Sequence, residues 1–213
     1  MGLTSLMIMM GCVQNEKTKL AICCAGDSLM RPVPNHLENI LKDSKGKIII
    51  KDWSRGGLSS KSYRAFFLKR WKGWRKTRPD FVLIQLGTND VRPLLQQEYD
   101  LENFRVNLKA IIKKFKTFKG GRYKTPKIFI ASVPLFCQES RGKEKNQLIE
   151  EEINPGIEEI ASEENITFVD NFSLLLHRAH LYSPDGVHPN SRGERALARN
   201  WLFWIRNELR KDY

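Results

Sequence analysis

The sequence lacks any apolar run close to the roughly 20 residues that a membrane-spanning helix needs, and it contains no internal repeat and no low-complexity tract. Its four cysteines form neither a CxxC pair nor a cluster with histidine, so nothing indicates a zinc site. These absences exclude transmembrane, repeat-protein and zinc-module classes. What remains is an ordinary globular composition of 213 residues, 41% hydrophobic and 28% charged, enough for one domain with a substantial core.

Acidic residues are also scarce: 24 Asp and Glu stand against 36 Lys and Arg, which leaves a net charge of +12. The excess is uneven, because residues 61–78 carry eight Lys or Arg and no acid, whereas residues 138–164 carry nine Glu. Such an imbalance favours anionic partners or surfaces, but more often it reflects two solvated helix faces of opposite sign. Because no helix-turn-helix pattern or RNA-recognition signature accompanies the charge, we expect no nucleic-acid partner.

Residues 1–18 are expected to be a leader, and residues 19–213 a single domain. The apolar stretch LTSLMIMMGC (3–12) resembles the end of a bacterial lipoprotein signal, with Cys12 as the lipidated residue. It has no basic segment in front of it, and its apolar part is short for a signal peptide. Two interpretations therefore stay open: an envelope lipoprotein anchored through Cys12, or a cytoplasmic protein with a disordered leader.

Near-continuous runs of Ile, Val, Leu and Phe predict strands buried on both faces of a parallel sheet. Inside the first run, Cys23 and Cys24 are most simply small core residues. There are five such runs, at residues 19–25, 47–53, 80–86, 127–133 and 165–170.

Segments with helical spacing alternate with these runs. Apolar residues recur at three- and four-residue steps in 101–118, and a last helix is predicted to begin at Ser191, with Glu194 completing a capping box. Strands that alternate with helices predict an α/β protein: a three-layer α/β/α sandwich with a central, mostly parallel five-stranded sheet.

In such a sheet, functional residues gather beyond the carboxyl ends of the strands. Four polar or glycine-rich loops follow predicted strands and are expected to converge there. They are AGDSLM (25–30), SRGGLSS (54–60), LGTNDV (86–91) and, further along the chain after the last strand, SPDGVHPN (183–190).

The first and last loops contain a candidate nucleophile and a candidate base. Ser28 is either the cap of a helix that begins near Leu29 or a nucleophile beside that helix N-terminus, whose N–H groups would favour a developing anion. Asp27 is more simply a structural carboxylate that binds loop amides. The spacing of Asp185 and His188 lets the carboxylate hold imidazole Nδ1–H, which leaves Nε2 free to accept a hydroxyl proton.

The middle loops supply hydrogen-bond donors. Asn89 is either a turn residue or a neutral donor that points into the crevice, and Gly57 is either a sharp turn or a place where a backbone N–H approaches a ligand. Together with the Ser28 N–H, they would form an oxyanion hole for acyl transfer.

The four loops resemble the four sequence blocks of the GDSL, or SGNH, hydrolase family. Gly26-Asp27-Ser28-Leu29, Gly57, Gly87-Thr88-Asn89-Asp90 and Asp185-Gly186-Val187-His188-Pro189 follow in family order, and GLSSKSY (57–63) is similar to a stretch of carbohydrate acetylesterases. The chain departs from the family at Asp52, where Asn is common, and WSRGG follows, so Trp53 and Arg55 are expected to form the rim of the site. The GxSxG elbow is absent, so the α/β-hydrolase fold is not implied.

The resemblance implies a flavodoxin-like SGNH fold and a serine esterase that needs no metal and no cofactor. It implies Ser28, His188 and Asp185 as catalytic residues, and Ser28, Gly57 and Asn89 as the oxyanion hole. The supporting residues that it implies are Gly26, Asp27, Gly87 and Asp90.

The implied substrate is a small ester or an acylated carbohydrate, most simply an acetyl ester. The alternatives left open are a lysophospholipase or thioesterase, an O-acetyltransferase, and a non-catalytic basic binding protein. Trp53, Trp71 and Trp74 would form a sugar-stacking platform, although Trp71 and Trp74 are more simply explained as packing a helix on the sheet.

Overall fold

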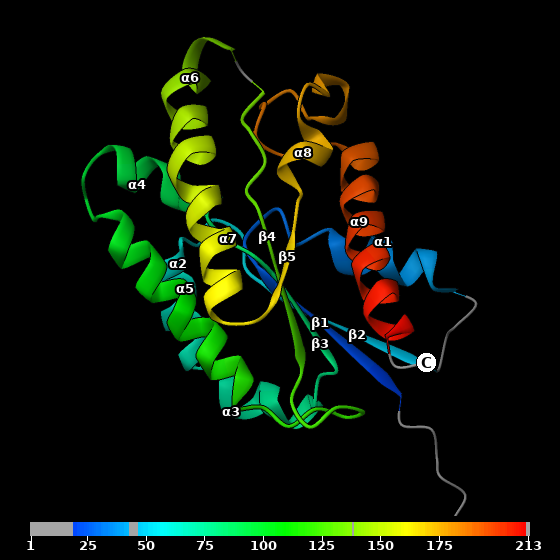
Figure 1. Cartoon of the computed structure of the whole chain (residues 1–213). Coiled ribbons are helices and arrows are strands. Elements are labelled where there is room, and N and C mark those ends of the chain that lie inside the picture. The colour runs from blue at the N-terminus through cyan, green and yellow to red at the C-terminus, as the bar shows by residue number, and fades with distance from the viewer. Residues whose placement is uncertain (1–18, 43–46, 138, 212–213) are drawn as a thin grey trace, which may run out of the picture.

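The computed structural model describes residues 19–42, 47–137 and 139–211 (Figure 1). At its centre lies a sheet with the strand order β2-β1-β3-β4-β5, in which all four strand pairings are parallel. The order is flavodoxin-like and reverses between β1 and β3. The five predicted strand segments are confirmed as β1 (Leu20–Gly26), β2 (Ile48–Ser54), β3 (Phe81–Gln85), β4 (Lys127–Ala131) and β5 (Thr167–Val169).

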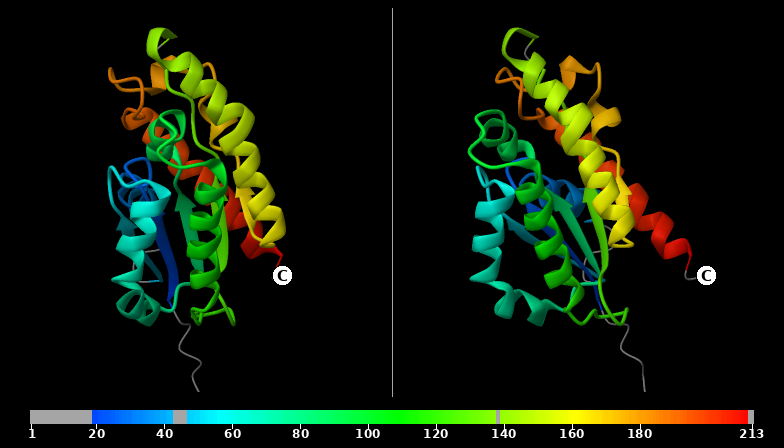
Figure 2. Two further views of the ribbon diagram at one scale, coloured as in Figure 1. Left: turned by 90° about the vertical axis from the view of Figure 1, so that its left-hand side faces the viewer. Right: turned by 60° about the vertical axis from the view of Figure 1, so that its left-hand side comes forward.

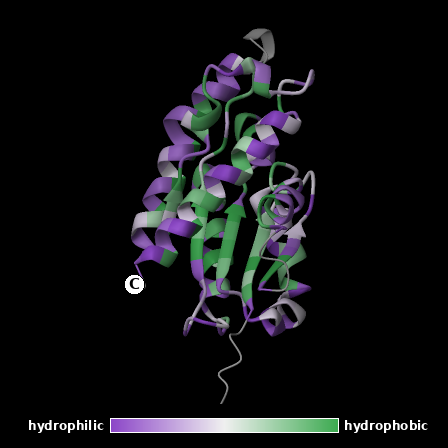
Figure 3. Ribbon diagram, turned by 90° about the vertical axis from the view of Figure 1, so that its right-hand side faces the viewer, coloured by the Kyte–Doolittle hydropathy of each residue, from purple (hydrophilic) through white to green (hydrophobic). Residues whose placement is uncertain are grey.

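Helices cover both faces of the sheet, which confirms the predicted three layers (Figures 1 and 2). One face packs against α1 (Val33–Ile40) and α9 (Ser191–Arg210). The other packs against α2 (Ser60–Leu68), α5 (Leu101–Lys116) and α7 (Asn154–Glu163). Figure 3 shows apolar strands between helices whose outer faces are largely polar.

Alternate residues of each strand contribute to opposite cores, because side chains in a strand point to alternating faces. In β1, Cys23 lies in the core under α2 and α5, and Cys24 in the core under α1 and α9. Both cysteines are fully buried, as expected from the sequence. The expectation that every strand is buried on both faces is wrong for β2, where Lys51 and Asp52 are exposed because β2 is an edge strand.

Short elements complete the described chain. They are α3 (Trp71–Trp74), η2 (Arg75–Thr77), η3 (Thr88–Asp90), α4 (Val91–Leu95), α6 (Glu139–Leu148), the π-helix η4 (Ile149–Ile153), α8 (Phe172–Leu175) and η5 (Ala179–Leu181). No helix within the described ranges is both long and apolar enough to cross a bilayer. The predicted leader and Cys12 lie outside the described residues, and the division into leader and single domain stays a prediction.

Helix α9 begins at Ser191 as predicted, but the capping box is wrong. The cap is Asn190, whose side-chain oxygen accepts from the backbone N–H groups of Arg192 and Gly193. Glu194 instead lies 3.1 Å from His36 Nε2 and ties α9 to α1. Asn is as good an N-cap as Ser, so the cap can lie one residue earlier than expected.

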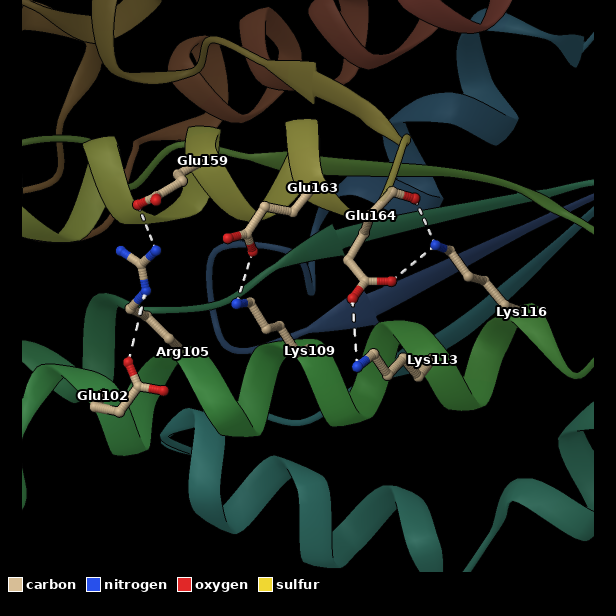
Figure 4. A network of polar contacts seen from close by, with 8 residues as sticks. All are labelled: Glu102, Arg105, Lys109, Lys113, Lys116, Glu159, Glu163 and Glu164. Carbon is tan, nitrogen blue, oxygen red and sulfur yellow. Dashed lines mark hydrogen bonds and ion pairs between the residues drawn. The ribbon is translucent and has the colours of Figure 1, made fainter.

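The acidic and basic segments differ in their charge partners. Figure 4 shows that glutamates at the end of α7 and just after it face α5, with Lys109 Nζ 2.7 Å from Glu163 and Lys116 Nζ 2.8 Å from Glu164. Arg105 pairs with Glu159 in the same row. By contrast, within the described ranges none of the eight cations in 61–78 forms an ion pair.

Candidate active site

Ser28 lies just beyond β1, in a run of turns that ends where α1 begins at Val33. The expected helix start near Leu29 is therefore wrong, so Ser28 is not a helix cap. Proline explains the later start, because Pro32 and Pro34 are tolerated at the beginning of a helix but not in its interior. Ser28 is half-buried.

His188 brings the first and last loops together, although 160 residues separate it from Ser28. Its Nε2 lies 2.9 Å from Ser28 Oγ, and its Nδ1 lies 2.7 Å from Asp185 Oδ2. The contact expected from the three-residue spacing is thus present. The arrangement allows a proton to pass from a hydroxyl to an imidazole that a carboxylate orients.

Asp185 is suited to hold that imidazole. Its other oxygen, Oδ1, accepts from the backbone N–H groups of Val187 and His188, each at 2.9 Å. Partial burial would raise the pKa of Asp185, but hydrogen bonds from the amide and ring of His188 outweigh it and hold that pKa below its usual range. Asp185 therefore stays charged at neutral pH. The two side chains are open to solvent, with 45% of His188 and 50% of Asp185 exposed.

The loop that carries His188 is held from both sides. Gly186 has φ +67°, which favours glycine, and its carbonyl accepts from Cys137 N–H at 2.6 Å. Asn190 Nδ2 donates to the carbonyls of His180 (2.8 Å) and Tyr182 (3.0 Å) while its oxygen caps α9. Sequence reasoning missed Asn190, although an Asn immediately before a helical pattern is a recognised cap signal.

Asn89 joins three of the loops. It lies in η3, directly after β3, and its Nδ2 donates to Asp27 Oδ2 (3.4 Å) and to the Leu58 carbonyl (3.3 Å). Both bonds are long, so the amide is available to a stronger acceptor. Among the described residues, neither the Ser28 N–H nor the Gly57 N–H has a protein acceptor.

The second loop lies against Ser28. Gly57 turns with φ +76°, and a Cβ added at Gly56 would lie 3.7 Å from Ser28 Cβ. The loop backbone therefore passes close to the candidate nucleophile. The structure thus brings together Ser28, Gly57 and Asn89, the residues expected to supply oxyanion donors.

Asp27 is a fully buried carboxyl group beneath the site. Its Oδ1 accepts from Leu29 N–H at 3.0 Å, so it binds a loop amide as expected. Burial raises the pKa of Asp27 to about 7, with nearby Asp90 contributing in the same direction. Near neutral pH the carboxyl beneath Asn89 therefore exists in both protonation states.

Asp90 and Gly87 shape the third loop. Buried Asp90 accepts from Ser60 N–H and from Ser60 Oγ (2.6 Å), and the hydroxyl of Tyr99 also donates to it. Gly87 has φ +124°, and a Cβ there would lie 2.6 Å from Val133 Cγ2, so any other residue would strain the backbone and displace Val133. Tyr99 also lines a cavity of about 1160 Å³ beside α2 and α5. Ser60 and Tyr99 gave no sequence signal, because only the fold brings them to Asp90.

The three tryptophans of the predicted platform pack in and against the hydrophobic core. Trp53 is buried and stacks on Trp74, with ring centroids 4.7 Å apart, and Trp71 and Trp74 pack against the same core. The sugar platform and the rim role of Trp53 are therefore wrong, and the packing interpretation of Trp71 and Trp74 is confirmed. Arg55 is exposed in the loop after β2. Within the described residues, no three His, Cys, Asp or Glu side chains are grouped as metal ligands.

The sequence matches a known protein family. The profile described as "GDSL-like Lipase/Acylhydrolase family" matches residues 24–196, which include all four loops. An acetylxylan esterase of Xylanibacter ruminicola is 32% identical over 142 residues, 60% of this chain and 29% of that protein. A multidomain esterase of Ruminococcus flavefaciens is 27% identical over 139 residues, 64% of this chain and 17% of that protein. The chain thus matches less than a third of the length of either relative.

A likeness to a solved structure bears on the fold only. The lipase/acylhydrolase from Enterococcus faecalis aligns with a TM-score of 0.70 and 19% identity, over 89% of this chain and 96% of that one.

Proposed function

Because the chain belongs to the GDSL-like lipase/acylhydrolase family, we propose that it is an ester hydrolase that removes small acyl groups, acetyl above all, from carbohydrate through an acyl-enzyme on Ser28. One observation carries the proposal: Ser28 Oγ, His188 and Asp185 form an unbroken chain of hydrogen-bond distances, 2.9 and 2.7 Å. That chain is the arrangement a serine nucleophile needs for activation.

In the proposed reaction, Ser28 Oγ attacks the ester carbonyl carbon while His188 Nε2 takes the hydroxyl proton. Asp185 holds Nδ1–H and stabilises the imidazolium that forms. His188 then gives the proton to the leaving alcohol oxygen, which leaves an acyl group on Ser28. Water, deprotonated by the same imidazole, releases the acid and restores Ser28.

The negative charge that develops on the carbonyl oxygen is met by the N–H groups of Ser28 and Gly57 and the amide of Asn89. Two features support this role: neither backbone N–H has a protein acceptor among the described residues, and the Asn89 bonds to Asp27 and Leu58 are long. Donors that are already in position stabilise the transition state without reorganising. The other implied residues, Gly26, Asp27, Gly87 and Asp90, act by shaping and joining the loops.

The open site and the relatives support the proposed substrate class. A nucleophile whose partners are about half exposed can reach an acyl group that projects from a large carbohydrate. The relatives described as an acetylxylan esterase and a multidomain esterase point the same way. A small acyl group also fits a site in which the Gly56 backbone lies against Ser28.

The test is an ester panel of increasing acyl length, together with acetylated xylan, run on the wild type and Ser28→Ala. We expect acetyl esters to be cleaved fastest and Ser28→Ala to be inactive but folded. Exposed Ser173, replaced by Ala, is the matched control and should keep full activity. A fluorophosphonate should label Ser28 in the wild type and in the control.

Other outcomes separate the alternatives. Preference for long acyl chains would indicate a lysophospholipase or thioesterase, and acyl transfer to a sugar in preference to water would indicate an O-acetyltransferase. Activity that survives Ser28→Ala, or a fluorophosphonate adduct on another residue, would overturn the proposed nucleophile.

A further inference from the structure

We propose that the end of the molecule opposite the candidate active site docks on an anionic lipid surface. The surface consists of six exposed cations, here called the basic edge: Arg75, Lys76, Arg78, Lys119, Arg122 and Lys124. This inference goes beyond the ester hydrolysis proposed above and does not depend on it.

Hydrogen bonds bring the basic edge together at the amino ends of the strands. Arg78 Nε donates to the Gly120 carbonyl at 3.2 Å, and Asp80 N–H donates to the Ala21 carbonyl at 2.8 Å. The segments 75–80 and 118–124 therefore lie side by side where β1 and β3 begin. Figure 2 shows α3 and these segments at the same end of the molecule, below the sheet.

These cations have no acidic partners in the described part of the chain. The acids nearby are engaged: buried Asp80 accepts from the backbone N–H groups of Ala21 and Arg122, and Glu208 pairs with Lys127 (3.0 Å) and Lys211 (2.8 Å). By contrast, the cations of α5 that Figure 4 draws each have a glutamate partner. Unpaired cations at this density raise the local potential and favour an anionic partner.

The same end has a cavity of about 570 Å³ and an amphipathic rim. Arg75, Lys76, Arg78 and Lys119 line the cavity together with Thr117 and Phe118. Beside it, two cations approach the ring of partly exposed Trp71, with Lys114 Nζ 3.5 Å and the Arg75 guanidinium 5.1 Å from its centroid. A partly exposed indole among Lys and Arg is typical of surfaces at the boundary between water and a bilayer.

The place where the described chain begins favours a lipid surface, and not another polyanion, as the partner of the basic edge. Residues 1–18, which include the apolar stretch 3–12, join the described chain at Lys19, one residue before β1 begins at Leu20. That point is at the same end of the molecule as the basic edge. Seven residues of β1 then separate this end from Ser28, about 20 Å at the usual rise of a strand. Docking at the basic edge would therefore leave the site facing away from the membrane.

The experiment is co-sedimentation of the full chain with vesicles of phosphatidylcholine, with or without about one phosphatidylglycerol in three lipids. We expect binding only to the anionic vesicles, and its loss at about 0.5 M salt. The triple variant Arg75→Glu, Lys76→Glu and Lys119→Glu should bind at least about 100-fold more weakly, since each cation near such a surface contributes about 1 kcal/mol. The neutral triple variant with Gln at these positions should show a smaller loss.

The matched control is Arg195→Glu with Arg199→Glu, which reverses exposed cations on α9 and should bind like the wild type. A far-ultraviolet circular dichroism spectrum like that of the wild type would show that each variant is folded. Equal binding to neutral vesicles would mean apolar insertion and would overturn the proposal. Undiminished binding of the basic-edge variants would also overturn the proposal. The same holds if the protein binds no vesicles, or if it binds a polyuronate but not vesicles.

Discussion

At the scale of single residues, the site depends on donors and acceptors placed to within tenths of an ångström. Asn89 illustrates this dependence, because its amide is held by two long hydrogen bonds, 3.3 and 3.4 Å, that a developing oxyanion can replace. A donor of this kind acts mainly on charge that appears in the transition state.

Asn89→Ala should therefore lower kcat by about 10²–10³ and change KM much less. Steady-state kinetics on an acetyl ester measures both constants. Asn207→Ala, which lies on α9 near its end, is the control and should match the wild type. A rise in KM alone would mean that Asn89 positions the substrate instead.

Asp185→Asn keeps the shape of the side chain but removes the charge that stabilises the imidazolium. It also favours the tautomer in which the nitrogen facing Ser28 is already protonated. We expect kcat near neutral pH to fall by about 10⁴. His188→Ala should be comparably damaging, and the double variant little worse than either, because the residues act as a unit. If Asp185→Asn kept most of its activity, another group would have to orient His188.

Buried Asp27 gives a prediction about pH and stability. Its pKa is about 7 in the folded protein, against an ordinary value of 3.8, so between pH 4 and 7 the folded state binds the proton that the unfolded state has lost. The free energy of unfolding should fall across this range, by up to about 4 kcal/mol from this group.

Asp27→Asn should remove the part of this fall in unfolding free energy that Asp27 contributes. Urea unfolding at pH 5 and pH 7 measures the difference. Asp100→Asn, which changes an exposed carboxyl group, should leave the wild-type slope nearly intact. An equally steep slope in Asp27→Asn would mean that the folded carboxyl titrates normally.

At the scale of secondary-structure elements, the close approach of β1 and β3 brings the first and third loops together. Gly26 lies at the end of β1, where an added Cβ would overlap the Gln85 carbonyl oxygen of β3 and come within 2.9 Å of Met30 Cβ. The overlapped atom belongs to the backbone, so it cannot move without separating the strands.

Gly26→Ala should therefore destabilise the fold by about 3 kcal/mol or more. Gly73→Ala is the matched control: no atom lies within 4 Å of its added Cβ, and alanine in a helix is expected to be neutral or slightly stabilising. Urea midpoints compare the two variants. Equal stability of Gly26→Ala and the wild type would mean that the strands have room to separate.

At the scale of the whole molecule, the net charge of +12 opposes compaction. The ion pairs of α5 with Glu163 at the end of α7 and with Glu164 just after it are partly exposed and contribute little individually. Added salt should therefore weaken the overall repulsion between like charges more than it weakens the attraction within these ion pairs.

Added salt, up to about 0.5 M, should raise Tm by about 2–4 °C, equivalent to roughly 1 kcal/mol. Scanning calorimetry measures the shift. The charge-reversed basic-edge variant should gain less, because it carries less repulsion. A lower Tm in salt would mean that the ion pairs of α5 outweigh the repulsion.

The sequence alone was sufficient for what depends on local pattern. Apolar runs predicted all five strands, although the edge strand β2 also carries exposed Lys51 and Asp52, and Cys23 and Cys24 were correctly assigned to the core. The order of the loops after these strands predicted which side chains share the carboxyl edge of the sheet, and three-residue spacing predicted the contact of Asp185 with His188.

Only the tertiary structure decided what depends on neighbours from distant parts of the chain. Lys51 is exposed because β2 is an edge strand. Trp53 is buried where it stacks on Trp74. Asp90 accepts a hydrogen bond from Tyr99, which only the fold brings close to it. The basic edge is likewise a tertiary feature, since its cations come from two segments, 75–78 and 119–124, that only the fold brings together. Packing pairs the glutamates of α7 with α5 and leaves the basic edge unpaired, because ion pairs depend on distances in space that the order of residues does not specify.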